Sequence, residues 1–322
     1  MYSQYGQAYG QGDSFASYGA TPGFEQQAPG FDMPIKSPFA RKRSSVVAIV
    51  TCLFIPLIIF VSVSAVLTFS VHFQNAALSK LVTLALLVVV ALFGYLAFAA
   101  FRRKTEGVSE PAWFAFLFMT SLVAWLAAYF AGSSNFNTNM QPFFEVQELN
   151  VYVSVNPSTY TGNQLMDAGR ITFTPGSHLD LTRSMGFKNL DVYCVAPVVG
   201  GGRNATNVST FDFWAVGLNC CSGHAPDFHC GEYNNVRAVS GLRLMREDQR
   251  AFFRLAVEQA EAAYGLQALH PIFMYWMQDP IAEVNAYQDD GYKYFLMGIF
   301  GFFAFQTVSV VIAAVVFSKM YG

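Results

Sequence analysis

Four long stretches without a charged residue constrain this sequence more than any other feature. Each has 20 residues or more, and they cover Val46–Val71, Leu81–Phe101, Ala112–Ala131 and Tyr294–Phe317. A helix needs about 20 apolar residues to cross the hydrocarbon core of a bilayer, so the stretches predict four membrane-spanning helices. The first stretch is longer than the apolar region of a cleaved signal peptide and begins after 45 residues. We therefore expect it to be an uncleaved signal anchor.

The composition agrees with a membrane protein and excludes other classes. Of the 322 residues, 53% are hydrophobic and 12% are charged. An average soluble protein has roughly a quarter of its residues charged, so a simple soluble enzyme is not expected. The net charge of −2 gives no basic surface for nucleic acid, and we expect no nucleic-acid partner. Residues 1–45 are rich in Tyr, Gln, Gly and Ser without apolar periodicity, which predicts a disordered tail.

Basic residues beside the four stretches predict the orientation of the chain. Seven of them flank the ends that would share one side of the membrane: Arg41, Lys42, Arg43, Arg102, Arg103, Lys104 and Lys319. Only Lys80 and Lys293 lie close to the opposite side. Lys and Arg are enriched in cytosolic loops, so both termini and the 102–111 loop are predicted to be cytosolic. This indicates an integral membrane protein of the secretory pathway or plasma membrane, with the lipid bilayer as its first partner.

Residues 132–293 are long enough to form a domain on the lumenal or extracellular side. Apolar alternation or β-rich composition predicts strands at 151–155, 171–173, 191–199 and 211–217. A helical stripe of Phe253, Ala256, Val257, Ala260 and Tyr264 predicts a helix over 246–264 that Gly265 ends. A further helix is expected from Pro280 towards the fourth span. The domain is thus predicted to be α+β, with its strands first and its helices second.

The predicted fold class is an all-α membrane bundle of four helices with an inserted α+β domain between spans 3 and 4. In chain order the parts are the tail 1–45, spans 1–3 within 46–131, the domain 132–293, span 4 at 294–317 and a cytosolic end at 318–322. Between residues 132 and 290 the domain has 16 acidic and 9 basic residues, which predicts a mildly acidic surface.

Four of the five cysteines lie in the inserted domain: Cys194, Cys220, Cys221 and Cys230. His224 and His229 lie near them, so a zinc site is one interpretation, although the spacing fits no standard paired knuckle. The other interpretation is two disulfides, which form in the secretory lumen or outside the cell. Adjacent cysteines rarely pair with each other. Cys220 and Cys221 would therefore each pair with one of the other two cysteines, which leaves two of the three possible connectivities. We favour the disulfides and expect no metal.

Two acceptor sequons for N-glycosylation begin at Asn204 and Asn207. Both fall in a Gly-rich part of the inserted domain, which is consistent with its lumenal placement. The chain shows no Gly-x-Ser-x-Gly elbow, no P-loop and no His-Glu-x-x-His motif. We therefore expect no catalytic residue and no cofactor.

Four spans, a short first loop, a long second loop and a Cys-Cys pair in that second loop form a particular layout. In this layout the chain resembles tetraspanins, with Cys220-Cys221-Ser222-Gly223 at the place of the family's Cys-Cys-Gly motif. The resemblance implies a protein that organises membrane assemblies. It would bind partner proteins laterally and through its large loop, with Cys194 and Cys230 as the disulfide partners of the pair.

The function expected from the sequence is that of a non-enzymatic membrane glycoprotein that organises lateral membrane-protein partners, or copies of itself, through the inserted domain. Two alternatives remain at this stage. One is a channel or transporter, or an accessory subunit of one, with a pore between copies lined by Gln306, Thr307 and Ser309. The other is a membrane-anchored lumenal enzyme with its site in the inserted domain.

Overall fold

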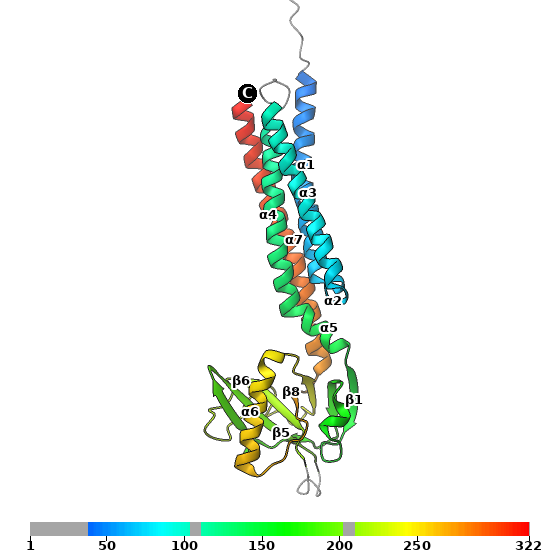
Figure 1. Cartoon of the computed structure of the whole chain (residues 1–322), viewed down its shortest axis with the longest axis vertical. Helices are drawn as coiled ribbons and strands as arrows, with labels where there is room; N and C mark the ends of the chain where they lie inside the picture. Colours follow the sequence, from blue (N-terminus) through cyan, green and yellow to red (C-terminus); the bar gives the residue numbers. More distant parts are fainter. Residues whose placement is uncertain (1–37, 104–110, 202–209, 322) are drawn as a thin grey trace, which may run out of the picture. The chain divides into compact units, whose positions relative to one another are not determined.

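The computed structural model describes residues 38–103, 111–201 and 210–321. It contains four long apolar helices and a sheet-rich domain inserted between the third and the fourth of them (Figure 1). The long helices are α1 (Pro38–Thr68), α3 (Ala76–Arg103), α4 (Pro111–Asn135) and α7 (Pro280–Tyr321), and a short helix α2 (Ser70–Gln74) joins α1 to α3. All four long helices are apolar and long enough to cross a membrane.

The helix ends differ from the ends of the predicted spans. The first long helix stops at Thr68, and the second begins at Ala76. At the other end, the predicted helix at Pro280 and the predicted fourth span form one continuous helix, α7. The charges of Asp289, Asp290 and Lys293 do not interrupt it, because charged residues at exposed or half-exposed positions are compatible with a helix.

Small residues of α4 are buried in the helix bundle, and one of them, Gly132, allows a close approach to α1. Ser121, Ala124 and Ala128 are fully buried, and Ala124, Ala128 and Gly132 follow one another at intervals of four residues. A Cβ atom added to Gly132 would lie 3.0 Å from the Cβ of Leu67 in α1. In membranes, such small side chains stabilise helix pairs by letting the backbones pack against each other.

A side chain of α7 makes a hydrogen bond to a carbonyl of α1 that a proline leaves without its helical donor. Pro56 has no N–H, so the carbonyl of Cys52, four residues earlier in α1, loses its usual helical donor. Gln306 of α7 is fully buried, and its Nε2 donates to that carbonyl over 2.6 Å. The aromatic rings of Phe60 and Phe302 stack nearby at 4.5 Å between centroids. The carbonyl that the proline leaves unpaired in one helix is thus satisfied by a polar residue of another.

The third helix continues past the predicted end of its span. A single π-helical turn, η2 (Phe136–Met140), follows α4, and α5 (Gln141–Gln147) completes the same helical path. Phe136, Met140 and Phe143 from this path pack with Leu242 of the sheet and Val284 of α7 in one apolar cluster. The inserted region therefore begins with helix, and its first strand starts only at residue 150.

The domain contains one sheet of eight strands: β1 (Asn150–Val155), β2 (Ala168–Phe173), β3 (His178–Leu179), β4 (Met185–Asn189), β5 (Asp191–Val199), β6 (Phe213–Leu218), β7 (Ser240–Arg243) and β8 (Ile272–Met277). Their order is β1-β2-β7-β8-β6-β5-β3, with β4 paired to the side of β5. The pairs β1–β2 and β6–β8 are parallel, and the other pairs are antiparallel. Short 3-10 turns, η3 (Gly162–Leu165) and η4 (Leu181–Arg183), connect some of them.

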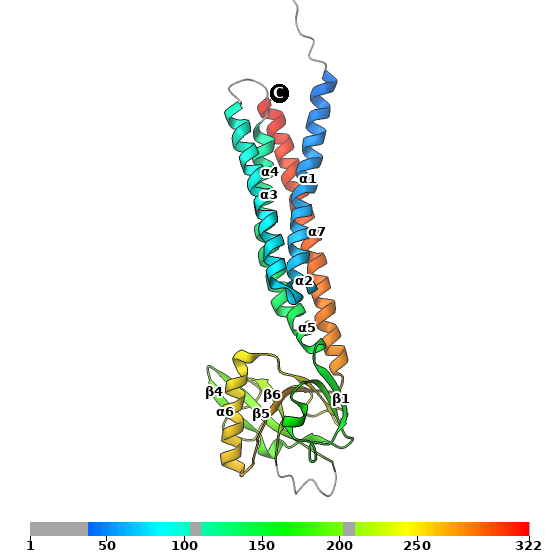
Figure 2. The ribbon, with the colours of Figure 1, turned by 45° about the vertical axis from the view of Figure 1, so that its right-hand side comes forward.

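Helix α6 (Glu247–Tyr264) covers one face of this sheet (Figure 2). Its buried residues Phe253, Ala256, Val257 and Ala260 confirm the predicted stripe. Gly265 ends the helix in the left-handed conformation, as expected, with φ of +67°. Tyr264 is partly buried, and its hydroxyl donates to the carbonyl of Ser184 over 3.0 Å.

The predicted order of strands first and helices second is wrong. The four predicted strands are present, but β7 and β8 lie after residue 239, on either side of α6. The sequence of β8, IFMYWM, has no polar alternation because both faces of this central strand are covered by side chains. Its continuous apolar run is equally typical of a buried helix, so alternation could not identify it.

Candidate functional site

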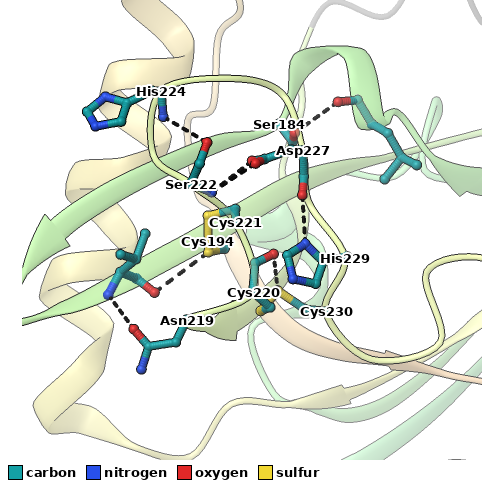
Figure 3. Close-up of a disulfide and its surroundings, with 12 residues drawn as sticks. Ser184, Cys194, Asn219, Cys220, Cys221, Ser222, His224, Asp227, His229 and Cys230 are labelled. Carbon is teal, nitrogen blue, oxygen red and sulfur yellow. Dashed lines mark hydrogen bonds between the residues drawn. A yellow bond between two sulfur atoms is a disulfide. The ribbon is translucent and has the colours of Figure 1, made fainter.

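The cysteines of the inserted domain form two disulfides, Cys194–Cys221 and Cys220–Cys230 (Figure 3). This is one of the two connectivities that the sequence left open. The Cα atoms are 5.9 Å and 5.2 Å apart, which is ordinary disulfide geometry. The sulfur atoms of Cys194, Cys220 and Cys230 lie within 4.8 Å of one another, but each belongs to a disulfide and not to a free thiolate.

These two disulfides hold residues 219–239 against the sheet. Residues 219–239, all of them described, form turns and bends without a helix or a strand. Phe228, Cys230 and Ala238 of this segment are buried against the face of the sheet opposite α6. This segment has no hydrogen-bond ladder of a helix or strand to hold it against the sheet. The two disulfides therefore substitute for the regular structure that a second helix would provide.

Glycines in the sheet make room for the sulfur atoms. A Cβ atom at Gly217 would lie 2.6 Å from the Sγ of Cys230, and one at Gly186 would lie 2.7 Å from the Sγ of Cys221. Both distances are shorter than a van der Waals contact, so any other residue would push a disulfide away from the sheet.

A carboxylate also closes the loop between the disulfides. Asp227 accepts hydrogen bonds from the backbone N–H of Ser222 at 2.9 Å and 3.1 Å (Figure 3). These bonds favour the charged carboxylate and lower the pKa of Asp227. The backbone N–H of His229 donates to the carbonyl of Cys220 over 2.9 Å. The loop is thus fixed at several points along its length.

The most unusual exposed group lies at the turn between β4 and β5. Leu190 has φ of +63°, and 98% of its surface is exposed. A left-handed conformation costs an L-residue other than Gly roughly 1–2 kcal/mol. Asn219 holds the turn from the next strand, since its side chain accepts from the N–H of Val192 and donates to Asp191, both over 2.9 Å. We call residues 189–191 the hairpin tip.

The hairpin tip therefore presents one apolar side chain, Leu190, on a strained turn that Asn219 holds in place. Leu218, which is also exposed, precedes Asn219 in the neighbouring strand. Strained conformations persist where the surroundings enforce them, and they are concentrated at functional sites. No sequence pattern predicted this exposure, because Leu190 lies just before the predicted strand at 191–199 and its turn is fixed by Asn219, which is far away in the chain.

Among the residues that the structure describes, no other predicted site residue contacts the hairpin tip. Asn204 and Asn207 lie outside the described residues, and so does Lys104. Arg41, Lys42 and Arg43 fall in the first turns of α1. Arg102 is exposed and lies over the ring of Phe98 at 4.8 Å, and Arg103 is the last residue of α3.

The residues proposed to line a pore between copies have other roles. Gln306 is buried within a single chain and bonds to α1, as described above. The hydroxyls of Thr307 and Ser309 donate to the carbonyls of Phe303 and Phe305 in their own helix, each over 2.8 Å. Hydroxyls bonded in this way are satisfied within the helix, and the pore between copies stays a prediction.

A cavity of about 550 Å³ with several polar residues in its lining lies between α1, α4, η2 and α7. Thr68, Asn135 and Asn139 line it and are buried. Asn139 donates to Asn135, whose own amide donates to the carbonyl of Gly291 over 2.8 Å. The hydroxyl of Thr68 is buried without a partner among the described residues. No local sequence pattern predicts this cavity, because its polar residues come from segments that are far apart in the chain.

No protein-family model, curated protein or solved structure matches this chain. The resemblance to tetraspanins therefore rests on the four helices, the position of the inserted domain and the disulfides of the Cys220-Cys221 pair. The sheet of the inserted domain is a difference, because the large loop of that family is mainly helical.

Proposed function

We propose that the four long helices span a membrane and that the inserted domain lies on its lumenal or extracellular side. Most side chains in the apolar parts of the helices are outside the protein core, including Leu81, Tyr95, Phe130 and Phe300. Water would not favour so many exposed apolar groups, whereas lipid would. The asymmetry of Lys and Arg supports cytosolic termini. The two disulfides support an oxidising compartment for the domain, where Asn204 and Asn207 would be glycosylated.

The function that this arrangement supports best is the organisation of membrane assemblies without catalysis. The hairpin tip is the observation that carries the proposal. An apolar side chain that is 98% exposed is unfavourable in water, and its strained turn is an additional cost. A protein partner with an apolar pocket would bury Leu190 at little entropic cost, because the turn is already held in one conformation. The expected role is tetraspanin-like: binding partner proteins beside the chain and through its large domain.

Native gel electrophoresis of mildly solubilised membranes tests this function. The wild-type chain should migrate in an assembly that contains other membrane proteins by mass spectrometry. The variant Leu190→Ser should migrate as the free chain. Val236→Ser is the matched control, since Val236 is 97% exposed but lies in an irregular loop without a positive φ.

Two results would overturn the proposal. One is a wild-type chain that migrates free, or only with copies of itself, in several mild detergents. The other is a shift to the free chain that Val236→Ser causes and Leu190→Ser does not, because the hairpin tip would then have no part in assembly.

A further inference from the structure

A second feature of the inserted domain lies away from the hairpin tip. A cavity of about 520 Å³ opens between the first turns of α6, the end of β7 and the loop that leads into β8. We call it the arginine cavity, because Arg243, Arg250 and Arg254 line it. Glu247 is the one carboxylate among the described residues that line it. These residues thus have an excess of two positive charges in a domain with more acidic than basic residues.

The guanidinium groups retain hydrogen-bond donors for a ligand. Arg243 is partly buried, and its Nη1 donates to the carbonyls of Met166 at 3.3 Å and Ala168 at 3.4 Å. Burial and the nearby charge of Arg250 lower the pKa of Arg243, whereas the charges of Glu247 and Asp167 oppose part of this shift. Arg250 contacts Glu247 over 3.1 Å. Such an exposed ion pair contributes little to stability, so a bound anion can compete with Glu247 for the guanidinium.

The wall of the cavity is fixed before any ligand arrives. Asp212 is buried, and its carboxylate accepts from the backbone N–H groups of Gly162 at 2.9 Å, Leu269 at 2.9 Å and His270 at 3.1 Å. A Cβ atom at Gly162 would collide with the carbonyl of His270. The cavity therefore keeps its shape through a buried carboxylate and a glycine, and a ligand would not have to order this loop on binding.

The rim of the cavity is apolar. Met166 and Leu269 line it and are 60% and 63% exposed. Arginine forks recognise carboxylate and phosphate oxygens, often through two parallel hydrogen bonds. Apolar side chains beside them favour a ligand that has an apolar body next to its charged group.

We propose that the arginine cavity binds a small soluble organic oxyanion, a carboxylate or phosphate ester attached to an apolar body. Arg243, Arg250 and Arg254 bind its oxygens. Met166 and Leu269 contact its apolar part. This site is separate from the hairpin tip, and neither proposal depends on the other.

Phenyl phosphate is a suitable probe, with the full chain in nanodiscs of phosphatidylcholine and binding measured by isothermal titration calorimetry. It should bind more tightly than inorganic phosphate and more tightly than phenol. Arg250→Gln should weaken binding by about tenfold or more, because a hydrogen bond to a charged group is lost. Because Arg243 also bonds to β2, Arg254→Gln is the second variant. Arg254 lines the cavity and contacts Glu258 over 3.1 Å. This exposed ion pair contributes little to stability, so the variant should weaken binding with little change in thermal unfolding.

Arg237→Gln is the control, because it removes the same charge from an exposed loop outside the cavity. It should leave the affinity unchanged. The proposal is overturned if phenyl phosphate does not bind, if phenol binds as tightly, or if Arg237→Gln weakens binding as much as Arg250→Gln does.

Discussion

The contact between Gln306 and the carbonyl of Cys52 makes a quantitative prediction about the helix bundle. This carbonyl needs a donor from α7 because Pro56 removes the donor within α1. The variant Gln306→Leu leaves the carbonyl unpaired in an apolar bundle, whereas Pro56→Ala restores a backbone N–H that can donate to it. Gln306→Leu should therefore be more destabilising in the wild-type background than in a chain that already carries Pro56→Ala.

The expected magnitude follows from the chemistry of the site. A buried polar group without a partner costs about 1–3 kcal/mol. Hydrogen bonds between membrane helices contribute on average about 0.6 kcal/mol and at most about 1.7 kcal/mol. Where these two ranges overlap, we expect a coupling energy between Gln306 and Pro56 of about 1 kcal/mol. The Oε1 of Gln306 has no partner among the described residues, and its removal is a gain in both backgrounds. That gain cancels in the double-mutant cycle.

Unfolding by sodium dodecyl sulfate in mixed micelles, followed by tryptophan fluorescence, measures these free energies. Trp113 is a suitable reporter because it packs in the same apolar cluster as Cys52. Thr307→Val is the matched control, since its hydroxyl bonds to the carbonyl of Phe303 in its own helix. Its effect should be the same in both backgrounds. A coupling energy near zero, or equal couplings for Gln306→Leu and Thr307→Val, would refute the reasoning.

Three further predictions concern the glycines, the disulfides and the loop carboxylate. Gly132→Leu should destabilise the bundle by about 1–3 kcal/mol through overpacking. Gly301→Leu should have little effect, because no neighbouring atom lies within 4 Å of a Cβ at that position. Unfolding of both variants in detergent measures the difference. The loop closed by Cys194–Cys221 spans 27 residues and the loop closed by Cys220–Cys230 spans 10. Replacing the first pair by Ala should therefore lower the free energy of unfolding in urea by about 3.5 kcal/mol, and replacing the second by about 2.7 kcal/mol. A larger loss for the second pair would contradict the account. Because the pKa of Asp227 is lowered in the folded chain, its contribution is present at neutral pH and is lost as the pH falls below about 4. Asp227→Asn should thus lower hydrogen-exchange protection of residues 220–230 at neutral pH, but much less once the pH is well below about 4.

Much of the architecture could be predicted because its determinants are local. A charge-free run of about 20 residues needs no partner to be recognised as a candidate span. The long helices contain all four runs, except for the end of the first run beyond Thr68. The stripe of α6 could likewise be predicted from the spacing of Phe253 and Ala256, since a helix repeats within the chain itself.

The parts that could not be predicted depend on residues far apart in the chain. The choice between the two disulfide connectivities depends on how residues 219–239 fold over the sheet. The exposure of Leu190 depends on Asn219, which follows a different strand and fixes the turn. Asp212 joins separate segments of the chain through its carboxylate. No short pattern predicts such a contact.

The central claim is that a disulfide-stabilised domain lies on the opposite side of the membrane from both termini. Protease treatment of sealed endoplasmic-reticulum vesicles, followed by non-reducing mass spectrometry, tests it most directly. Residues 1–45 and the 102–111 loop should be digested from outside. Residues 132–290 should survive until detergent is added and should then yield peptides linked through Cys194–Cys221 and Cys220–Cys230. Digestion of residues 132–290 in intact vesicles, or recovery of these cysteines as free thiols, would contradict the account.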